Sequence, residues 1–126
     1  MKIVRGKDFE FVPASHEDPK DPGTYKKVLF GREEFIDGHA QMLNWARMPV
    51  GKSFNLHYHE TLVEVFVMLK GKADITVGGE TEAIGPGDAV MIDIGQKHSM
   101  KNTGDEDVEY IVFGISTGAD GKTVNI

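Results

Sequence analysis

Short runs rich in β-branched, aromatic and other apolar residues alternate with turn signals along the chain from residue 24 onward. Runs of this kind, bounded by turn residues, are typical of strands. We predict strands at residues 24–30, 39–48, 55–59, 63–69, 72–77, 80–84, 89–93, 98–102 and 108–116. No run has convincing helical periodicity. About nine short strands predict an all-β fold, a closed or nearly closed barrel of two sheets.

The two ends of the chain differ from this alternating region. Residues 1–23 are predicted to be irregular, because the stretch PASHEDPKDPG at 13–23 places three prolines and a glycine among charged residues. The barrel is expected over about 24–117. Residues 1–126 should form one domain, since the chain is too short for a second core. The tail from residue 117 is expected either to be loose or to add an edge strand.

Three glycine-containing sites predict tight turns between the strands. They are Asp37-Gly38, Gly78-Gly79 and the run GPGD at 85–88. The Gly78-Gly79 pair fits a two-residue hairpin, because a primed turn needs positive φ at both central positions.

The candidate chemistry lies in the middle of the chain, within residues 51–71. Side chains two residues apart on a strand share a face, so His57 and His59 point the same way. Glu64 has the opposite parity, and a turn or bulge near residues 60–62 must bring it to the same side. A carboxylate buried among apolar residues is costly unless it is paired or binds a cation. We therefore predict a metal site.

His98 supplies a fourth candidate ligand, because it opens a predicted strand after a turn at Gly95. Three imidazoles and one carboxylate suit one divalent transition metal: Mn, Fe, Co, Ni, Cu or Zn. On an octahedral ion, four protein ligands leave two adjacent positions for water, oxygen or a bidentate substrate. This open arrangement is typical of a catalytic rather than a closed structural site.

The spacing of these residues resembles the two sequence motifs of the cupin superfamily. The matching residues are Gly51, His57, His59, Glu64, Gly71, Gly87, Gly95, His98 and Asn102. The resemblance implies a small single-domain cupin, a double-stranded β-helix (cupin jelly-roll barrel), with His57, His59, Glu64 and His98 as metal ligands and frequent dimerisation. It implies no particular substrate, because cupins include dioxygenases, isomerases, decarboxylases, lyases and non-enzymatic binders.

One position departs from the cupin pattern. Asp93 stands where the family usually has proline. We interpret Asp93 as a turn-capping side chain, since aspartate commonly bonds to the backbone of a turn.

A substrate pocket is predicted next to the metal site. The even-numbered residues of 42–48 look like the inner set, which leaves Trp45 and Arg47 outside. The predicted substrate-binding residues are Asn44, Phe54, Phe66 and Met100. With Tyr110 they form a mainly apolar pocket that has two polar groups, the Asn44 amide and the Tyr110 phenol. An exposed Trp45 beside Arg47 favours a homodimer.

The composition excludes several classes of function, and the two remaining histidines are not expected to bind the metal. His16 and His39 are expected to lie at the surface, His16 in the proline-rich segment and His39 after a turn. With 14 Lys+Arg against 20 Asp+Glu the net charge is −6, which disfavours nucleic acid. No cysteine is present, so a metal must use His, Asp or Glu. No apolar run suggests a signal peptide or a membrane span, and we expect a cytoplasmic protein with no membrane partner.

The leading functional hypothesis is a metal-dependent cupin enzyme that acts on a small oxygenated organic molecule. This substrate would chelate the metal. We rank dioxygenase-type oxidation first among the reaction classes, and isomerase or lyase chemistry next. Glu64 and Tyr110 are the predicted catalytic residues, Glu64 as a proton acceptor and Tyr110 as a group that orients the substrate. The alternative is a non-catalytic module that binds a metal or small metabolite. Metal-independent sugar-nucleotide isomerisation is disfavoured, because such cupins usually lack the complete ligand set.

Overall fold

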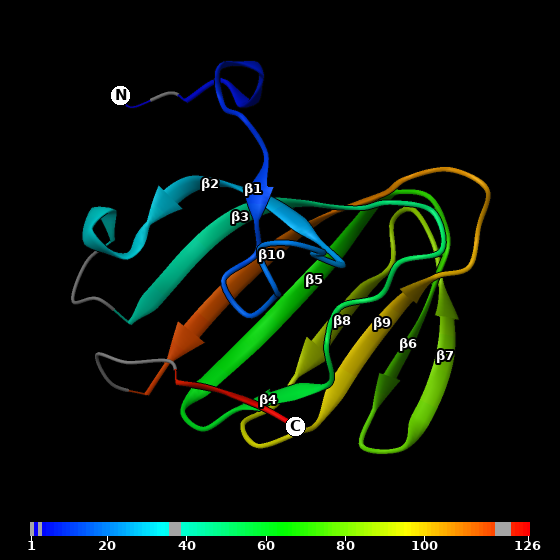
Figure 1. Cartoon of the computed structure of the whole chain (residues 1–126). Helices are drawn as coiled ribbons and strands as arrows, with labels where there is room; N and C mark the ends of the chain where they lie inside the picture. The colour runs from blue at the N-terminus through cyan, green and yellow to red at the C-terminus, as the bar shows by residue number, and fades with distance from the viewer. Residues whose placement is uncertain (1, 3, 36–38, 118–121) are drawn as a thin grey trace.

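The computed structural model describes residues 2, 4–35, 39–117 and 122–126, which form two antiparallel β-sheets (Figure 1). The predicted all-β fold is confirmed, and the strand positions follow the alternating runs closely. The described strands are β1 (Val12–Pro13), β2 (Tyr25–Gly31), β3 (Ala40–Met48), β4 (His57–His59), β5 (Leu62–Lys70), β6 (Ala73–Val77), β7 (Glu80–Ile84), β8 (Ala89–Ile92), β9 (His98–Asn102), β10 (Val108–Ser116) and β11 (Thr123–Asn125). Two short 3-10 helices, η1 (Gly6–Asp8) and η2 (Arg32–Glu34), lie outside the sheets.

The chain passes back and forth between the two sheets. The six-stranded sheet has the order β1-β2-β3-β10-β5-β8, and the five-stranded sheet has the order β11-β4-β9-β6-β7. From β4 to β10 the strands alternate between the sheets, with β6 and β7 joined as a hairpin in the same sheet. This winding is the double-stranded β-helix that the sequence predicted.

The inner faces of the two sheets form a single core. Alternate residues of β3, β5, β9 and β10 are buried, as expected for strands that pack on one side. The most deeply buried large side chains include three methionines, Met48, Met68 and Met100. Flexible thioether side chains fill irregular space well, which suits the junction of two twisted sheets.

The turns agree with the glycine pattern where the structure describes them. Gly78 and Gly79 have φ of 57° and 88°, so the hairpin between β6 and β7 uses a conformation that strains other residues. Residues 86–87 of the GPGD run also form a turn. The predicted Asp37-Gly38 turn lies outside the described residues.

The turn before β9 corrects the interpretation of Asp93. The Gln96 amide donates to the Asp93 carbonyl, and the Gln96 side chain accepts from the Asp93 amide at 2.9 Å. The Asp93 side chain itself is exposed. Gln96, rather than Asp93, is therefore the capping side chain.

The N-terminal segment is more ordered than the sequence predicted. β1 pairs with β2 of the same chain, so the segment adds a strand to the six-stranded sheet. Ala14, Glu17 and residues 22–24 are buried. The prolines and charges at 13–23 therefore mark an irregular path that is packed against the barrel, not a surface segment outside it.

Trp45 faces outward as predicted, but it is only partly exposed. Its indole nitrogen donates to Glu109 at 2.9 Å, and Gly6 of the N-terminal segment lies against its ring. Lys27 lies over the same ring. The chain itself covers part of Trp45, which removes the main argument for a dimer interface there. The homodimer remains a prediction.

The C-terminal tail adds an edge strand, which is one of the two predicted outcomes. β11 pairs with β4 and brings Thr123 opposite His59. Among the described residues, no helix has the length and apolar character needed to cross a membrane.

Candidate metal centre

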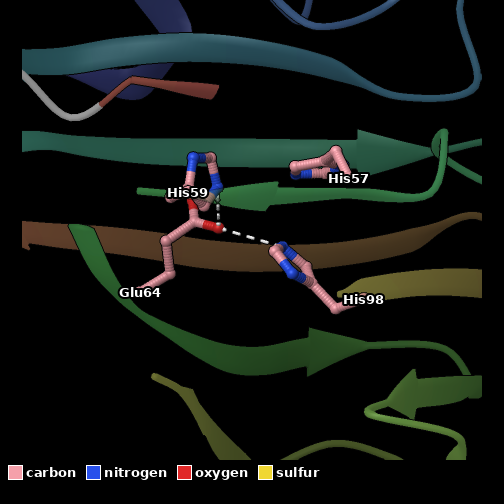
Figure 2. A group of neighbouring side chains, drawn as sticks. All are labelled: His57, His59, Glu64 and His98. Carbon is pink, nitrogen blue, oxygen red and sulfur yellow. Dashed lines mark hydrogen bonds and ion pairs between the residues drawn. The ribbon is translucent and has the colours of Figure 1, made fainter. Parts of the chain in front are cut away.

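The four predicted ligands come together from both sheets (Figure 2). His57 and His59 lie on β4 and His98 on β9, all in the five-stranded sheet, where His57 pairs with His98. Residues 60–61 form a bend, after which the chain enters the six-stranded sheet as β5 and carries Glu64. The predicted change of parity between His59 and Glu64 is thus confirmed, because the chain changes sheets at this bend.

The donor atoms are close and deeply buried. His59 Nε2 lies 2.8 Å from Glu64 Oε1, and His98 Nε2 lies 3.3 Å from the same oxygen. The ring centroids of His57 and His98 are 4.3 Å apart. All four residues are at most 6% exposed, and one donor atom from each lies within 4.8 Å of the others.

Each histidine is held through its Nδ1 atom. His57 Nδ1 bonds to the Asn55 carbonyl and His98 Nδ1 to the Gln96 carbonyl. A carbonyl only accepts, so Nδ1 donates in both cases, and Nε2 carries the lone pair when the ring is neutral. His59 Nδ1 lies 3.0 Å from the Thr123 hydroxyl on β11. These contacts orient Nε2 toward the centre of the cluster, as outer partners do for metal-binding histidines.

Burial and neighbouring charge set the protonation of the cluster. Burial lowers the pKa of His57 from 6.5 to about 3, which keeps this imidazole neutral at neutral pH. Burial alone would raise the pKa of Glu64, but the adjacent His59 and His98 imidazoles outweigh it and lower the pKa to about 2. The cluster thus presents an ionised carboxylate and a neutral imidazole, the forms that bind metals.

The arrangement contains a buried nitrogen that a cation would satisfy. His98 Nε2 is buried and makes no hydrogen bond of acceptable geometry, although Glu64 Oε1 is 3.3 Å away. A neutral His98 therefore directs a lone pair at a carboxylate oxygen, and a proton or a metal ion must lie between them. Bonds of about 2.1 Å place neighbouring ligand atoms about 3 Å apart on an octahedral ion, close to the two separations seen at Glu64. The donor set fits a divalent transition metal.

A cavity of about 370 Å³ opens beside the cluster, and four of the five predicted pocket residues line it. These are Asn44, Phe54, Phe66 and Tyr110. Met100 does not line it; its side chain, 1% exposed, is part of the core. Met100 shares the inner face of β9 with His98. It lies two residues further along the strand, within the hydrophobic core and away from the cavity.

The two predicted polar groups of the pocket differ in their hydrogen bonding. Asn44 is 8% exposed, and its Oδ1 atom has no hydrogen-bond partner. Tyr110 Oη lies 3.0 Å from Thr24 Oγ1, which donates to the Arg47 carbonyl. Because the threonine proton is used there, Tyr110 donates to Thr24 and offers only lone pairs to the cavity. Burial also raises the pKa of Tyr110, so the phenol stays neutral.

His16 contradicts its expected surface role. Its ring stacks on His57 with centroids 4.4 Å apart, and it lines the cavity. Its Nδ1 atom lies 3.0 Å from Glu17 Oε2, and the buried Glu17 carboxylate also accepts from the Gly23 and Asn55 amides. His39, in contrast, is exposed as expected. The proline-rich composition of 13–23 gave no signal that this segment packs on the cluster.

A double-stranded β-helix with three histidines and one glutamate buried beside a cavity defines a small barrel protein with a candidate metal centre. A family model described as "Cupin domain" matches residues 44–114, more than half of the chain. The chain belongs to the cupin family, as its two motifs indicated.

The comparisons also find similar proteins. The oxalate-binding protein of Thermotoga maritima is 32% identical over 79 residues, which cover 63% of this chain and 65% of that protein, slightly less than two thirds of its length. An uncharacterized protein of Methanocaldococcus jannaschii is 32% identical over 104 residues, covering 82% of this chain and 79% of that one. Among solved structures, a predicted oxalate decarboxylase from Thermotoga maritima has a TM-score of 0.82 and 27% identity, covering 91% of this chain and 99% of that one.

Proposed function

We propose that the protein binds one divalent transition metal through His57, His59, Glu64 and His98, and uses it to hold a small oxygenated organic substrate. The observation that carries this proposal is the buried four-donor cluster beside an open cavity that His57, His59 and Glu64 line, together with a buried His98 Nε2 that makes no hydrogen bond. When bound, such an ion would supply Lewis-acid polarisation of substrate oxygens.

The cavity residues give the substrate its orientation. Asn44 Oδ1 and the Tyr110 oxygen are acceptors, so they suit hydroxyl or other hydrogen-donating groups of the substrate. Phe54 and Phe66 cover the apolar part, with their rings edge to face at a centroid distance of 6.0 Å. Asn44 and Tyr110 are buried, which strengthens the polar contacts that they make with a ligand.

Among the candidate reactions, we rank oxidation of the bound substrate by dioxygen first. Isomerisation and lyase reactions rank next. Glu64 is the candidate proton acceptor, because its ionised oxygen already contacts His59 and His98 at the centre of the site. The role of Tyr110 is limited to hydrogen bonding, since its proton is donated to Thr24.

A second candidate function is non-catalytic binding of a small oxyanion. One similar protein is named an oxalate-binding protein, and its alignment spans 65% of its length. The same centre would then hold a ligand without turnover.

Substrate screening of the reconstituted protein distinguishes the two. The protein is loaded in turn with Mn, Fe, Co, Ni, Cu or Zn, and oxygen uptake and carbon dioxide release are followed with oxalate and larger organic acids. Turnover with one metal supports the enzyme, and saturable calorimetric binding without turnover supports the binding module. If neither binding nor turnover occurs for any metal, the proposed function is wrong.

A further inference from the structure

Lys26 is a cation on the inner face of the barrel. On β2 it pairs with Ala46, which pairs in turn with Tyr110 on β10. Ala46 and Tyr110 are both core residues, so this row of side chains faces inward. Lys26 itself is partly buried and lines the cavity.

The ammonium group has no carboxylate partner within the described part of the chain. Among the described residues, it donates a hydrogen bond to Ser15 Oγ. A partly buried ammonium loses some of its hydration, and a neutral hydroxyl replaces little of it. An anion placed in the cavity would satisfy this charge.

Lys26 lies at the opposite end of the cavity from Glu64. The inner face of the six-stranded sheet carries three successive rows: Lys26, Ala46 and Tyr110; then Val28, Asn44, Val112 and Phe66; then Met42, Gly114 and Glu64. Neighbouring rows are two residues apart, or about 7 Å along a strand, so Lys26 is about 13 Å from the Glu64 row in that direction.

Ser15 and His16 connect the two ends. Ser15 accepts from Lys26, and the next residue, His16, stacks on His57 of the metal centre. The N-terminal segment thus lies along the cavity wall between the cation and the cluster. Because the backbone rows of Lys26 and Glu64 are about 13 Å apart along the strands, we expect a ligand that reaches from the metal centre to Lys26 to be longer than a two-carbon dianion such as oxalate.

We propose that the substrate is an elongated organic acid, with metal-chelating oxygens at one end and a carboxylate at the other that pairs with Lys26. This inference rests on the proposed function, because it assumes that the chelating end occupies the metal centre. Lys26 is a specificity residue in this account, and its neighbour Ser15 orients the ammonium group.

The test uses hydroxamates, which chelate divalent metals through two oxygens. The probes are the monohydroxamates of succinic, adipic and suberic acids, each compared with the methyl-terminated hydroxamate of the same length. Binding to the cobalt-loaded protein is measured by calorimetry and by the visible spectrum of the ion. In the native protein, we expect the two longer carboxylate probes to bind more tightly than their methyl-terminated counterparts. The succinic probe should show no such difference.

Three variants separate the charge from the fold. Lys26→Met should weaken binding of the longer carboxylate probes by about fivefold or more, while the methyl-terminated probes change less than about twofold. Lys26→Arg should retain most of the effect. Lys101→Met removes the same charge from an exposed position on β9. It should not change the affinity for the carboxylate probes or for the methyl-terminated probes. High salt should reduce the carboxylate effect, because it screens a partly exposed pair.

The outcomes separate the two proposals. If hydroxamates bind but Lys26→Met weakens carboxylate and methyl-terminated probes equally, the role of Lys26 is wrong and the metal site stands. If every carboxylate probe binds no better in native protein than in Lys26→Met, the same conclusion holds. If no hydroxamate binds the cobalt-loaded protein, the proposed function fails, and the inference about Lys26 fails with it.

Discussion

The two sheets make different contributions to the site. The five-stranded sheet supplies the three imidazoles, each held through Nδ1 by a carbonyl or hydroxyl. The six-stranded sheet supplies one carboxylate and much of the cavity wall, including the unpartnered Asn44 Oδ1. One sheet is therefore built to hold a metal with little reorganisation, whereas the other leaves polar groups available to a ligand.

This difference has a structural consequence. A metal bound by His57, His59 and His98 on one sheet and by Glu64 on the other would link the two layers of the barrel. Metal binding and barrel stability should therefore be coupled, since the metal binds only the folded arrangement. Ligand binding, in contrast, should depend mainly on residues of the six-stranded sheet and the N-terminal segment.

The largest expected effect is loss of metal on removal of an imidazole. His98→Ala should reduce metal content from about one equivalent to below about a tenth, because His98 is fully buried at the centre of the cluster. Glu64→Gln should retain partial occupancy through the three imidazoles. Elemental analysis after reconstitution and desalting measures both. Equal metal content in His98→Ala and native protein would contradict the assignment.

Acid should destabilise the metal-free protein. His57 has a pKa of 6.5 when exposed and about 3 when folded, so the unfolded chain binds more protons between these values. Glu64 falls from 4.5 to about 2, and the unfolded chain again binds more protons in that range. Both effects make stability fall as pH falls, beginning near pH 6.5 and continuing below 4.5. Urea denaturation at several pH values tests this slope, and a flat profile from pH 7 to pH 4 would oppose it.

Chelation should lower the melting temperature of the metal-loaded protein. At a free metal concentration about 100 times the dissociation constant, binding adds about 2.7 kcal/mol, or roughly 10 °C for a domain of this size. Calorimetric scans with and without a chelator measure the change, and readdition of metal should restore it. A melting temperature that does not respond would mean that the metal is not bound at a folded site.

A smaller effect is expected at the outer partner of His59. Thr123→Val keeps the shape of the side chain but removes the hydroxyl that contacts Nδ1. Metal affinity should fall by about tenfold, as is typical when such a partner is lost. Competition with a chromogenic chelator provides the measurement. Thr76→Val, which removes a hydroxyl on β6 that bonds to Thr81 Oγ1, is the matched control.

The smallest effect is expected in the cavity. Tyr110→Phe should leave metal content unchanged, because the phenol contacts Thr24 and not the cluster. Affinity for a hydroxylated acid should change by less than about tenfold, the effect of one neutral hydrogen bond. If this variant abolished turnover while it kept both metal and ligand, Tyr110 would have a chemical role that its hydrogen bond to Thr24 argues against.

The strands and the four-residue cluster could be predicted from sequence because both depend on local periodicity. The apolar runs at 62–70 and 108–116, bounded by turn residues, predict strands, and the spacing of His57, His59 and Glu64 requires a bend between them. The cluster then needs only one distant residue, His98, on a neighbouring strand.

The residues that line the cavity could be predicted less completely, because contacts between segments distant in the sequence determine which of them face it. His16 reaches His57 through a path of the N-terminal segment that Glu17 fixes by bonds to Gly23 and Asn55. No periodic pattern encodes that path. Lys26 is one of two adjacent lysines, and only the pairing of β2 with β3 shows which of them faces inward.

We propose that one metal ion links the two sheets through His57, His59, Glu64 and His98. A crystal structure of the metal-loaded protein, with anomalous diffraction measured at the absorption edge of the bound metal, tests this most directly. We predict one strong peak per chain, bonded to Nε2 of His57, His59 and His98 and to a Glu64 oxygen. A peak bonded to other residues, or no peak in protein that contains stoichiometric metal, would contradict the account.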